Sequence, residues 1–118
     1  MAVTVVVVDD DAGFRRVVTM LLTARGLSVV AEAVDGASGI EAVRRHAPDA
    51  VLLDLNLPDR DGLAVARALR LADRPPTVVL ASTDASPWPP EELTEAGIRS
   101  FVVKDRLFDA DFDALFSS

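Results

Sequence analysis

Five short apolar runs constrain the fold of this chain more than any other feature of its sequence. They lie at Thr4–Val8, Leu27–Val34, Ala50–Leu53, Thr77–Leu80 and Ser100–Val103. The first run reads Thr-Val-Val-Val-Val, with no alternation of apolar and polar residues. Continuous β-branched runs of this kind are typical of strands that are covered on both faces, as in parallel sheets. The sequence therefore predicts five buried parallel strands.

Segments with helical periodicity separate these runs. Apolar residues recur three and four positions apart in four stripes: Phe14, Val17, Val18, Leu21 and Leu22; Ala37, Ile40, Val43 and Ala47; Leu63, Ala66, Leu69 and Ala72; and Phe108, Phe112, Leu115 and Phe116. Asp11, Asp35 and Asp61 stand where helix N-caps are expected, and Gly26 stands where the first helix should end. Strands that alternate with helices form α/β folds. We therefore expect a doubly wound (βα)5 fold around a parallel five-stranded sheet.

The segment Asp84–Pro90 interrupts this pattern where the fourth helix should begin. It holds prolines at positions 87, 89 and 90, and proline is excluded from a helix interior. We expect an ordered loop there, either pinned to the surface by Trp88 or serving as a partner-binding face. A short fourth helix over residues 91–96 should follow. The last helix, over residues 109–116, is also expected to be short.

Composition excludes several classes of function. The length of 118 residues fits one domain. A net charge of −7 with scattered arginines argues against direct nucleic-acid binding by this chain. The absence of cysteine excludes disulfides and thiol chemistry, and the single His46 cannot form a histidine metal cage. No apolar run is long enough to span a membrane, and no signal peptide is visible. We expect a cytoplasmic domain without membrane contact.

Polar side chains collect where the predicted strands end. Asp9 and Asp10 follow the first strand, whereas Asp54, Ser82 and Lys104 end the third, fourth and fifth. These positions share one edge of a parallel sheet, where close carboxylates need a compensating cation. Oxygen ligands without histidine or cysteine favour Mg2+. A metal ion, a hydroxyl and an ammonium suit phosphoryl transfer. Lys104 is the only lysine among 12 basic residues, which indicates a site that needs a compact ammonium.

Four segments, taken together, resemble the receiver domain of bacterial response regulators. They are VVVVDDD (Val5–Asp11), VLLDLNLPDRDGL (Val51–Leu63), VVLAST (Val78–Thr83) and FVVKD (Phe101–Asp105). The resemblance covers essentially the whole chain and implies one receiver domain over residues 1–118. It implies a flavodoxin-like fold with strand order 2-1-3-4-5 and a role in two-component phosphorelay signalling. Such a domain assists its own phosphorylation and dephosphorylation and is otherwise no enzyme.

The resemblance also implies how the acidic residues are used. Asp54 would be the phosphoacceptor. Asp10 would hold Mg2+ directly, whereas Asp9 would hold it mainly through water. Asp54 and the backbone carbonyl of Asn56 would complete the metal site. Asp11 is expected to be only the cap of the first helix.

The resemblance implies that the remaining matched residues surround the phosphoryl group. Ser82 is expected to donate a hydrogen bond to a phosphoryl oxygen, and Lys104 is expected to pair first with Asp54 and then with the phosphate. Phe101 would take the aromatic switch position, and Thr83 would stand beside the phosphate. Two alternatives stay open. A register slip of one residue makes Thr83 the hydroxyl ligand, and Phe101 can serve as plain core.

The resemblance implies both upstream and downstream partners. The phosphodonor is a histidine kinase or a histidine phosphotransfer protein. The output is a downstream protein or a missing effector domain, with a phosphorylation-dependent homodimer as a further expectation. The chain ends soon after its last apolar stripe, which favours a stand-alone receiver. The LDLNLP segment resembles the branch that often carries helix-turn-helix outputs, so a fragment of a DNA-binding transcriptional regulator is the alternative.

Two enzyme or carrier classes compete with this interpretation. A haloacid-dehalogenase-like phosphatase has Asp-x-Asp after a strand, and Asp9–Asp11 meets that minimum. Gly13 stands where that family usually has threonine or valine, and the chain is short for such an enzyme. A flavodoxin-like flavin carrier needs a hydroxyl- and glycine-rich phosphate loop after the first strand, whereas this chain is acidic there.

Overall fold

The structure is a computed structural model that describes residues 2–116. Within this range, five strands form one sheet in the order β2-β1-β3-β4-β5, and all neighbouring pairs are parallel. The strands are β1 (Thr4–Val8), β2 (Ser28–Ala33), β3 (Ala50–Asp54), β4 (Thr77–Ser82) and β5 (Ile98–Val103). The expected strand order is confirmed, with bounds that differ by up to two residues. Residues 1, 117 and 118 of the expected domain lie outside the described residues.

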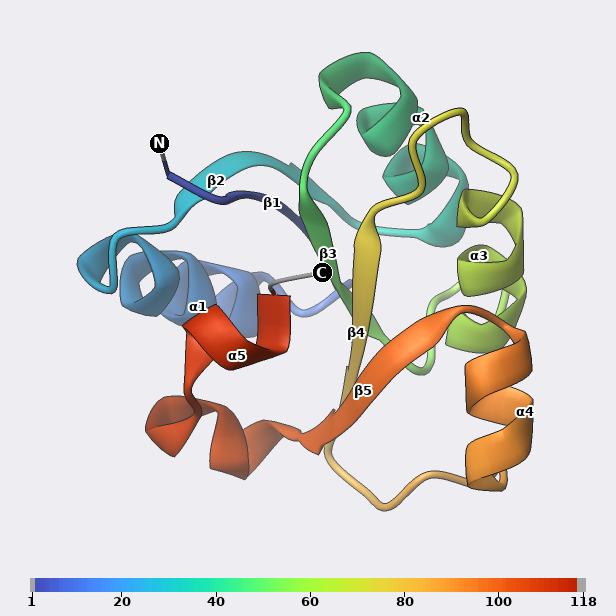
Figure 1. Ribbon diagram of the computed structural model, residues 1–118. Coiled ribbons are helices and arrows are strands. Elements are labelled where there is room, and N and C mark those ends of the chain that lie inside the picture. The colour runs from blue at the N-terminus through green and yellow to red at the C-terminus, as the bar shows by residue number, and fades with distance from the viewer. Residues whose placement is uncertain (1, 117–118) are drawn as a thin grey trace.

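Helices cover both faces of this sheet (Figure 1). The α-helices are α1 (Ala12–Ala24), α2 (Gly36–His46), α3 (Gly62–Leu69), α4 (Pro90–Glu95) and α5 (Phe112–Phe116). Helices α1 and α5 pack on one face, and α2, α3 and α4 pack on the other (Figure 1). The fold is therefore the doubly wound (βα)5 architecture. Within residues 2–116, no helix is long and apolar enough to cross a membrane.

Strand β1 shows why its apolar run is continuous. Val6 and Val8 belong to the core beneath α2, α3 and α4, whereas Val5 and Val7 belong to the core beneath α1 and α5. Each of these valines is at most 1% exposed. Alternate side chains of a strand point to opposite faces. Both sets must therefore be apolar when helices cover both sides.

The predicted helix boundaries are confirmed at four positions. The carboxylates of Asp11, Asp35 and Asp61 each accept a hydrogen bond from the N–H three residues later, at 3.1, 2.8 and 2.8 Å. These bonds satisfy donors that the first turn leaves free. Gly26 follows the C-cap of α1 with φ +89°, a conformation that glycine adopts without strain. Local capping chemistry therefore sets these ends.

Some stripe residues face solvent, contrary to the helical pattern. They are Val17, Ala37, Ala47, Ala72 and Phe108. The buried positions of α2 are Gly36, Gly39 and Val43. A Cβ atom on Gly39 would lie 2.9 Å from a valine methyl of β1. At Gly39 the helix therefore lies so close to the sheet that there is no room for an alanine methyl group. Ala72 lies beyond the end of α3.

The expected last helix over residues 109–116 is wrong in its extent. A 3-10 helix, η1, spans Lys104–Asp109, and α5 begins only at Phe112. Ala110 between them is extended (φ −75°, ψ 150°). The guanidinium of Arg25 donates to the carbonyls of Phe108 and Ala110 at 3.0 and 3.2 Å. In a continuous helix these carbonyls would accept hydrogen bonds from backbone N–H groups of the same helix. Here they accept them from Arg25 instead.

The proline-rich segment forms a loop before a short α4, as expected. Helix α4 begins at Pro90, where a missing N–H costs no helical hydrogen bond. Trp88 is half-buried and packs against the core beneath α2, α3 and α4. Its backbone N–H and C=O both bond to the hydroxyl of Ser86, at 3.1 and 2.9 Å. Trp88 therefore pins this loop.

Candidate functional site

The strand register brings the predicted site residues to one edge of the sheet. The N–H of Asp9 donates to the last residue of β2 at 3.0 Å. Asp54 pairs with Ala81 at the end of β4, and Ser82 pairs with the last residue of β5. Lys104 is the next residue of the chain. The carboxyl ends of neighbouring strands thus hold these side chains together.

Three carboxylates form a cluster at this edge. Oxygens of Asp9, Asp10 and Asp54 all lie within 4.8 Å of one another. Asp9 is 1% exposed and Asp54 is 9% exposed, whereas Asp10 faces solvent. An all-oxygen cluster that is open on one side fits a hard cation that keeps several waters. The described residues therefore include a candidate divalent-metal site made by these three aspartates.

Lys104 links the two buried carboxylates of the cluster. Its Nζ lies 2.7 Å from Oδ2 of Asp9 and 3.3 Å from Oδ1 of Asp54. Burial and the neighbouring charge of Asp9 raise the pKa of Asp54, although Lys104 opposes them. Burial lowers the pKa of Lys104, but its hydrogen bond to Asp9 and the charges of both aspartates outweigh this effect, so the pKa is raised overall. The lysine therefore stays an ammonium at neutral pH.

The turn between β1 and α1 holds Asp9 in place. Its Oδ1 accepts a hydrogen bond from the N–H of Asp11 at 2.9 Å. Its backbone carbonyl accepts one from Nη1 of Arg15 at 2.7 Å, and Nε of Arg15 also bonds to Glu32 at 3.2 Å. Sequence reasoning missed Arg15, because nothing in its spacing distinguishes it from the other arginines. The carboxylate of Asp11 caps α1, in agreement with its expected role.

The loop after β3 carries Asn56 and is anchored to α2. Asn56 pairs with Asp61 in a short antiparallel bridge. Asp59, between them, accepts hydrogen bonds from the N–H groups of Gly36 and Ala37 at 2.7 and 2.9 Å. The bond from Gly36 in particular lowers the pKa of Asp59. Sequence reasoning missed this anchor, because residues 36 and 59 become neighbours only in the folded chain.

The structure separates Ser82 from Thr83 clearly. Ser82 is 3% exposed at the end of β4, and its Oγ accepts a hydrogen bond from the N–H of Asp84 at 3.3 Å. Thr83 is exposed. Phe101 in β5 is half-buried against the core beneath α2, α3 and α4. Of the two residues with hydroxyls, Ser82 at the end of β4 therefore has the buried side chain and Thr83 the exposed one.

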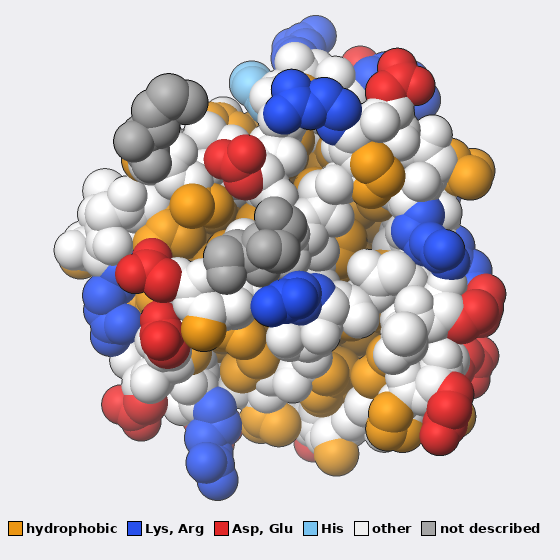
Figure 2. Space-filling view, viewed as in Figure 1, with side chains coloured by type: hydrophobic (Ala, Val, Ile, Leu, Met, Phe, Trp, Pro, Cys, Tyr) orange, Lys and Arg blue, Asp and Glu red, His pale blue; other side chains and the backbone are white. Residues whose placement is uncertain are grey.

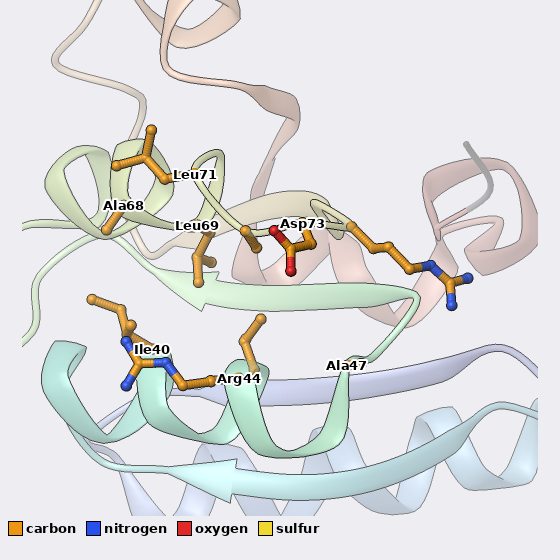
Figure 3. A pocket seen from close by; sticks show the side chains of 10 residues that line it. Ile40, Arg44, Ala47, Ala68, Leu69, Leu71 and Asp73 are labelled. Atoms are coloured by element: carbon orange, nitrogen blue, oxygen red, sulfur yellow. The ribbon is translucent and has the colours of Figure 1, made fainter.

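A separate hollow lies near the C-terminal ends of α2 and α3 (Figure 3). Its volume is about 760 Å3, and its wall includes Ile40, Arg44, Leu69 and Leu71. Helices that follow strands of a parallel sheet begin at the edge where the acidic cluster lies, so their C-terminal ends lie at the opposite edge. The hollow is therefore distinct from the carboxylate cluster.

The comparison with protein families decides the class of this domain. The chain matches the family described as "Response regulator receiver domain" over residues 5–111. It belongs to that family. The receiver domain acts in two-component phosphorelay signalling. Nothing in the comparisons supports the dehalogenase-like phosphatase.

Curated relatives and solved structures agree with this assignment. The chemotaxis protein CheY of Bacillus subtilis is 31% identical over 114 residues, which are 93% of this chain and 95% of CheY. The probable transcriptional regulatory protein NarL of Mycobacterium tuberculosis is 39% identical over 104 residues, 87% of this chain and 48% of NarL. The solved receiver domain of M. tuberculosis NarL superposes with a TM-score of 0.86 at 34% identity and covers 99% of this receiver.

The relatives differ in what lies outside the receiver. This chain spans nearly all of CheY but only about half of NarL. It spans 21% of a protein-glutamate methylesterase of Natronomonas pharaonis, to which it is 45% identical over 78 residues. Receivers similar to this one therefore occur in relatives of very different total length.

Proposed function

We propose that this receiver accepts a phosphoryl group on Asp54 from a phosphohistidine donor and changes conformation to control an output. The geometry around Asp54 carries the proposal. Its carboxylate ends β3, clusters with Asp9 and Asp10, and lies 3.3 Å from the Lys104 ammonium. A nucleophile, a cation site and a fixed positive charge are the parts that phosphoryl transfer requires.

Mg2+ is the cofactor that this donor set fits. Asp9, Asp10, Asp54 and the backbone carbonyl of Asn56 would hold it, with water completing the shell. When bound, the ion neutralises charge on the carboxylates and on the phosphoryl oxygens. Asp10 is the exposed member of the cluster, so it is the carboxylate best placed for direct binding from solvent.

The transfer itself is an in-line displacement. An oxygen of the Asp54 carboxylate attacks phosphorus while the bond to the donor's histidine nitrogen breaks, and the electron pair leaves with the imidazole. Lys104 turns its ammonium from the free carboxylate to the phosphoryl oxygens. Asp9 keeps that ammonium close to the reacting atoms through its 2.7 Å contact. The domain thereby assists its own phosphorylation and, with water as the nucleophile, its dephosphorylation.

Phosphorylation would alter the segment after β4 through Ser82. The phosphoryl group adds a charge of about −1.5 to −2. The hydroxyl of Ser82 now accepts a bond from the N–H of Asp84, and donating to a phosphoryl oxygen would move it and release that contact. Thr83, the next residue of the chain, would stand beside the phosphate, and the half-buried Phe101 would take the aromatic switch position. The loop over residues 84–90 and α4 would transmit the change.

The partners follow from the same chemistry. A histidine kinase or a histidine phosphotransfer protein would supply the phosphoryl group. An output protein or an attached effector domain would respond, with a phosphorylation-dependent homodimer as one form of response. The relatives include a transcriptional regulatory protein and a chemotaxis protein, so both kinds of output stay in the proposal. The proposal also includes a cytoplasmic location for this receiver.

The decisive experiment is phosphorylation by acetyl phosphate with Mg2+, followed by intact-mass measurement. The parent should gain one phosphate that hydroxylamine removes, as expected of an acyl phosphate. Asp54→Asn lacks the nucleophilic oxygen at nearly constant shape and should gain none. Asp105→Asn, an exposed acid beside Lys104, is the matched control and should behave like the parent. Normal phosphate uptake by a folded Asp54→Asn variant would refute the assignment.

A further inference from the structure

An aromatic ring lies directly against the Lys104 ammonium. The centroid of the Phe14 ring is 4.2 Å from Nζ of Lys104. Phe14 is in the first turns of α1 and is half-buried at the margin of the core beneath α1 and α5. The helical pattern alone accounts for an apolar residue at this position, but it does not account for a ring facing an ammonium.

The ring attracts the ammonium without taking a hydrogen bond from it. A cation within about 6 Å of a ring centroid is drawn to the negative face of the π system. An ammonium has three N–H donors. Asp9 and Asp54 are its two carboxylate partners, at 2.7 and 3.3 Å. Because the ring accepts none of these donors by a conventional bond, they stay available for the carboxylates and for an incoming phosphoryl group.

The same turn positions the ring and the acidic cluster. The N–H of Phe14 donates to the carboxylate of Asp11 at 3.1 Å, and the N–H of Asp11 donates to Asp9 at 2.9 Å. The backbone around the ring is therefore tied to the carboxylate that also binds Lys104. An aliphatic side chain here would cover the ammonium equally well but would not attract it.

We propose that Phe14 is a positioning residue, whose ring holds the Lys104 ammonium between Asp9 and Asp54 for phosphoryl transfer. This inference rests on the proposed function, because it assigns the ring a part in phosphorylation of Asp54. Its chemical basis can nevertheless be tested in the unphosphorylated domain.

The first measurement uses the fact that Lys104 is the only lysine of the chain. Protein labelled with [ε-13C]lysine gives a single side-chain NMR signal. In the parent, the protons on Cε should be shifted upfield by the ring current of Phe14. Phe14→Leu should abolish this shift, and Phe14→Tyr, which keeps a ring face, should retain it. Phe108→Leu makes the same change on η1, at an exposed position, and should leave the signal unchanged.

The second measurement is the initial rate of phosphorylation by acetyl phosphate with Mg2+. Phe14→Leu should lower this rate about two- to thirtyfold, the range that corresponds to the usual strength of a cation–π contact. Phe14→Tyr should keep most of the parent's rate, because it keeps a ring face against the ammonium. A loss of core packing alone would not predict this difference between the two variants. Urea unfolding of each variant confirms that the comparison is made between folded proteins.

The outcomes separate this inference from the proposed function. A parent that takes up no phosphate on Asp54 overturns the proposed function, whatever the lysine signal shows. Normal uptake by the parent, together with a full rate in Phe14→Leu, overturns the inference alone. An unshifted lysine signal in the parent also overturns it. A lost shift and a lowered rate in Phe14→Leu, both restored in Phe14→Tyr, support it.

Discussion

Asp10 and Asp11 are neighbours in the sequence, yet their carboxylates have different surroundings. The Asp10 carboxylate faces solvent within the cluster that includes Asp9 and Asp54. The Asp11 carboxylate accepts the N–H of Phe14 at the start of α1 and lies outside the cluster. One residue therefore belongs to a candidate metal site and the next to a helix cap.

This difference predicts unequal effects on metal binding. Asp10→Asn should weaken Mg2+ binding to the unphosphorylated domain at least about tenfold, because it removes a charged ligand. Asp11→Asn should change the affinity by less than about twofold, since asparagine caps a helix nearly as well as aspartate. Isothermal titration calorimetry with Mg2+ measures both affinities. Equal losses would mean that Asp11 is a ligand.

At the scale of secondary-structure elements, the connection from β3 to α3 determines where Asp54 sits. The N–H of Gly62, the first residue of α3, donates to the carbonyl of Leu55 at 2.7 Å. A Cβ atom at Gly62 would lie 2.8 Å from the backbone oxygen of Asp54 and 2.7 Å from a methyl of Leu80. The helix start is therefore packed against the strand end with no room for a side chain.

Gly62→Ala should destabilise the domain by about 1–3 kcal/mol, because backbone and core must shift to admit the methyl group. The same shift should slow phosphorylation of Asp54. Gly13→Ala in α1 is the matched control. Its Cβ would meet only the side-chain oxygen of Asp11, at 3.3 Å, and its effect should stay within about 1 kcal/mol. Urea unfolding compares the two variants. Similar small effects would show that the β3–α3 contact is looser than described.

At the scale of the whole molecule, the chain carries a net charge of −7, and charged side chains of both signs lie on the surface. Figure 2 shows acidic side chains over α4 at the lower right and basic side chains at the top, near α2. The last turn of α2 carries Arg44, Arg45 and His46. Within this view, basic side chains form no continuous stripe of the kind that tracks a nucleic-acid backbone (Figure 2). The surface in this view therefore agrees with the expectation that this chain does not bind nucleic acid directly.

The raised pKa of Asp54 makes the stability of the fold depend on pH. The pKa lies above the ordinary value of 3.8 mainly because of burial, with Asp9 adding to it. At a pH between the ordinary pKa, which applies to the unfolded chain, and the raised pKa of the folded protein, Asp54 binds a proton in the folded protein but not in the unfolded chain. The contribution of Asp54 to the unfolding free energy therefore falls as pH rises through this window, and the loss is complete above it.

Asp54→Asn, which stays neutral, should consequently be more stable than the parent at neutral pH without Mg2+. The difference should shrink as pH falls into the window, because the parent's carboxyl then becomes neutral too. Urea unfolding in a series from about pH 4 to about pH 8 measures it. A constant difference across the series would mean that the ionised carboxylate costs no stability in the folded state.

Much of the fold and of the site could be predicted from the sequence, because both depend on local pattern. Continuous valine runs indicate strands that are covered on two faces. An aspartate directly before a segment with helical periodicity indicates where a helix begins. The carboxyl ends of parallel strands share one edge, so residues at those ends must meet once the strand pattern is known. Asp9, Asp54, Ser82 and Lys104 could be grouped for this reason.

Tertiary structure alone decided the remaining features, because each depends on residues that are distant in the sequence. The close approach of α2 to β1 buries Gly39 instead of the alanines that periodicity favours. Arg25 takes two carbonyls from the C-terminal segment and separates η1 from α5. Phe14 meets the Lys104 ammonium across 90 positions of sequence. Periodicity records which side of a helix is apolar, but only packing determines how near that side comes to its neighbours and which charge lies against it.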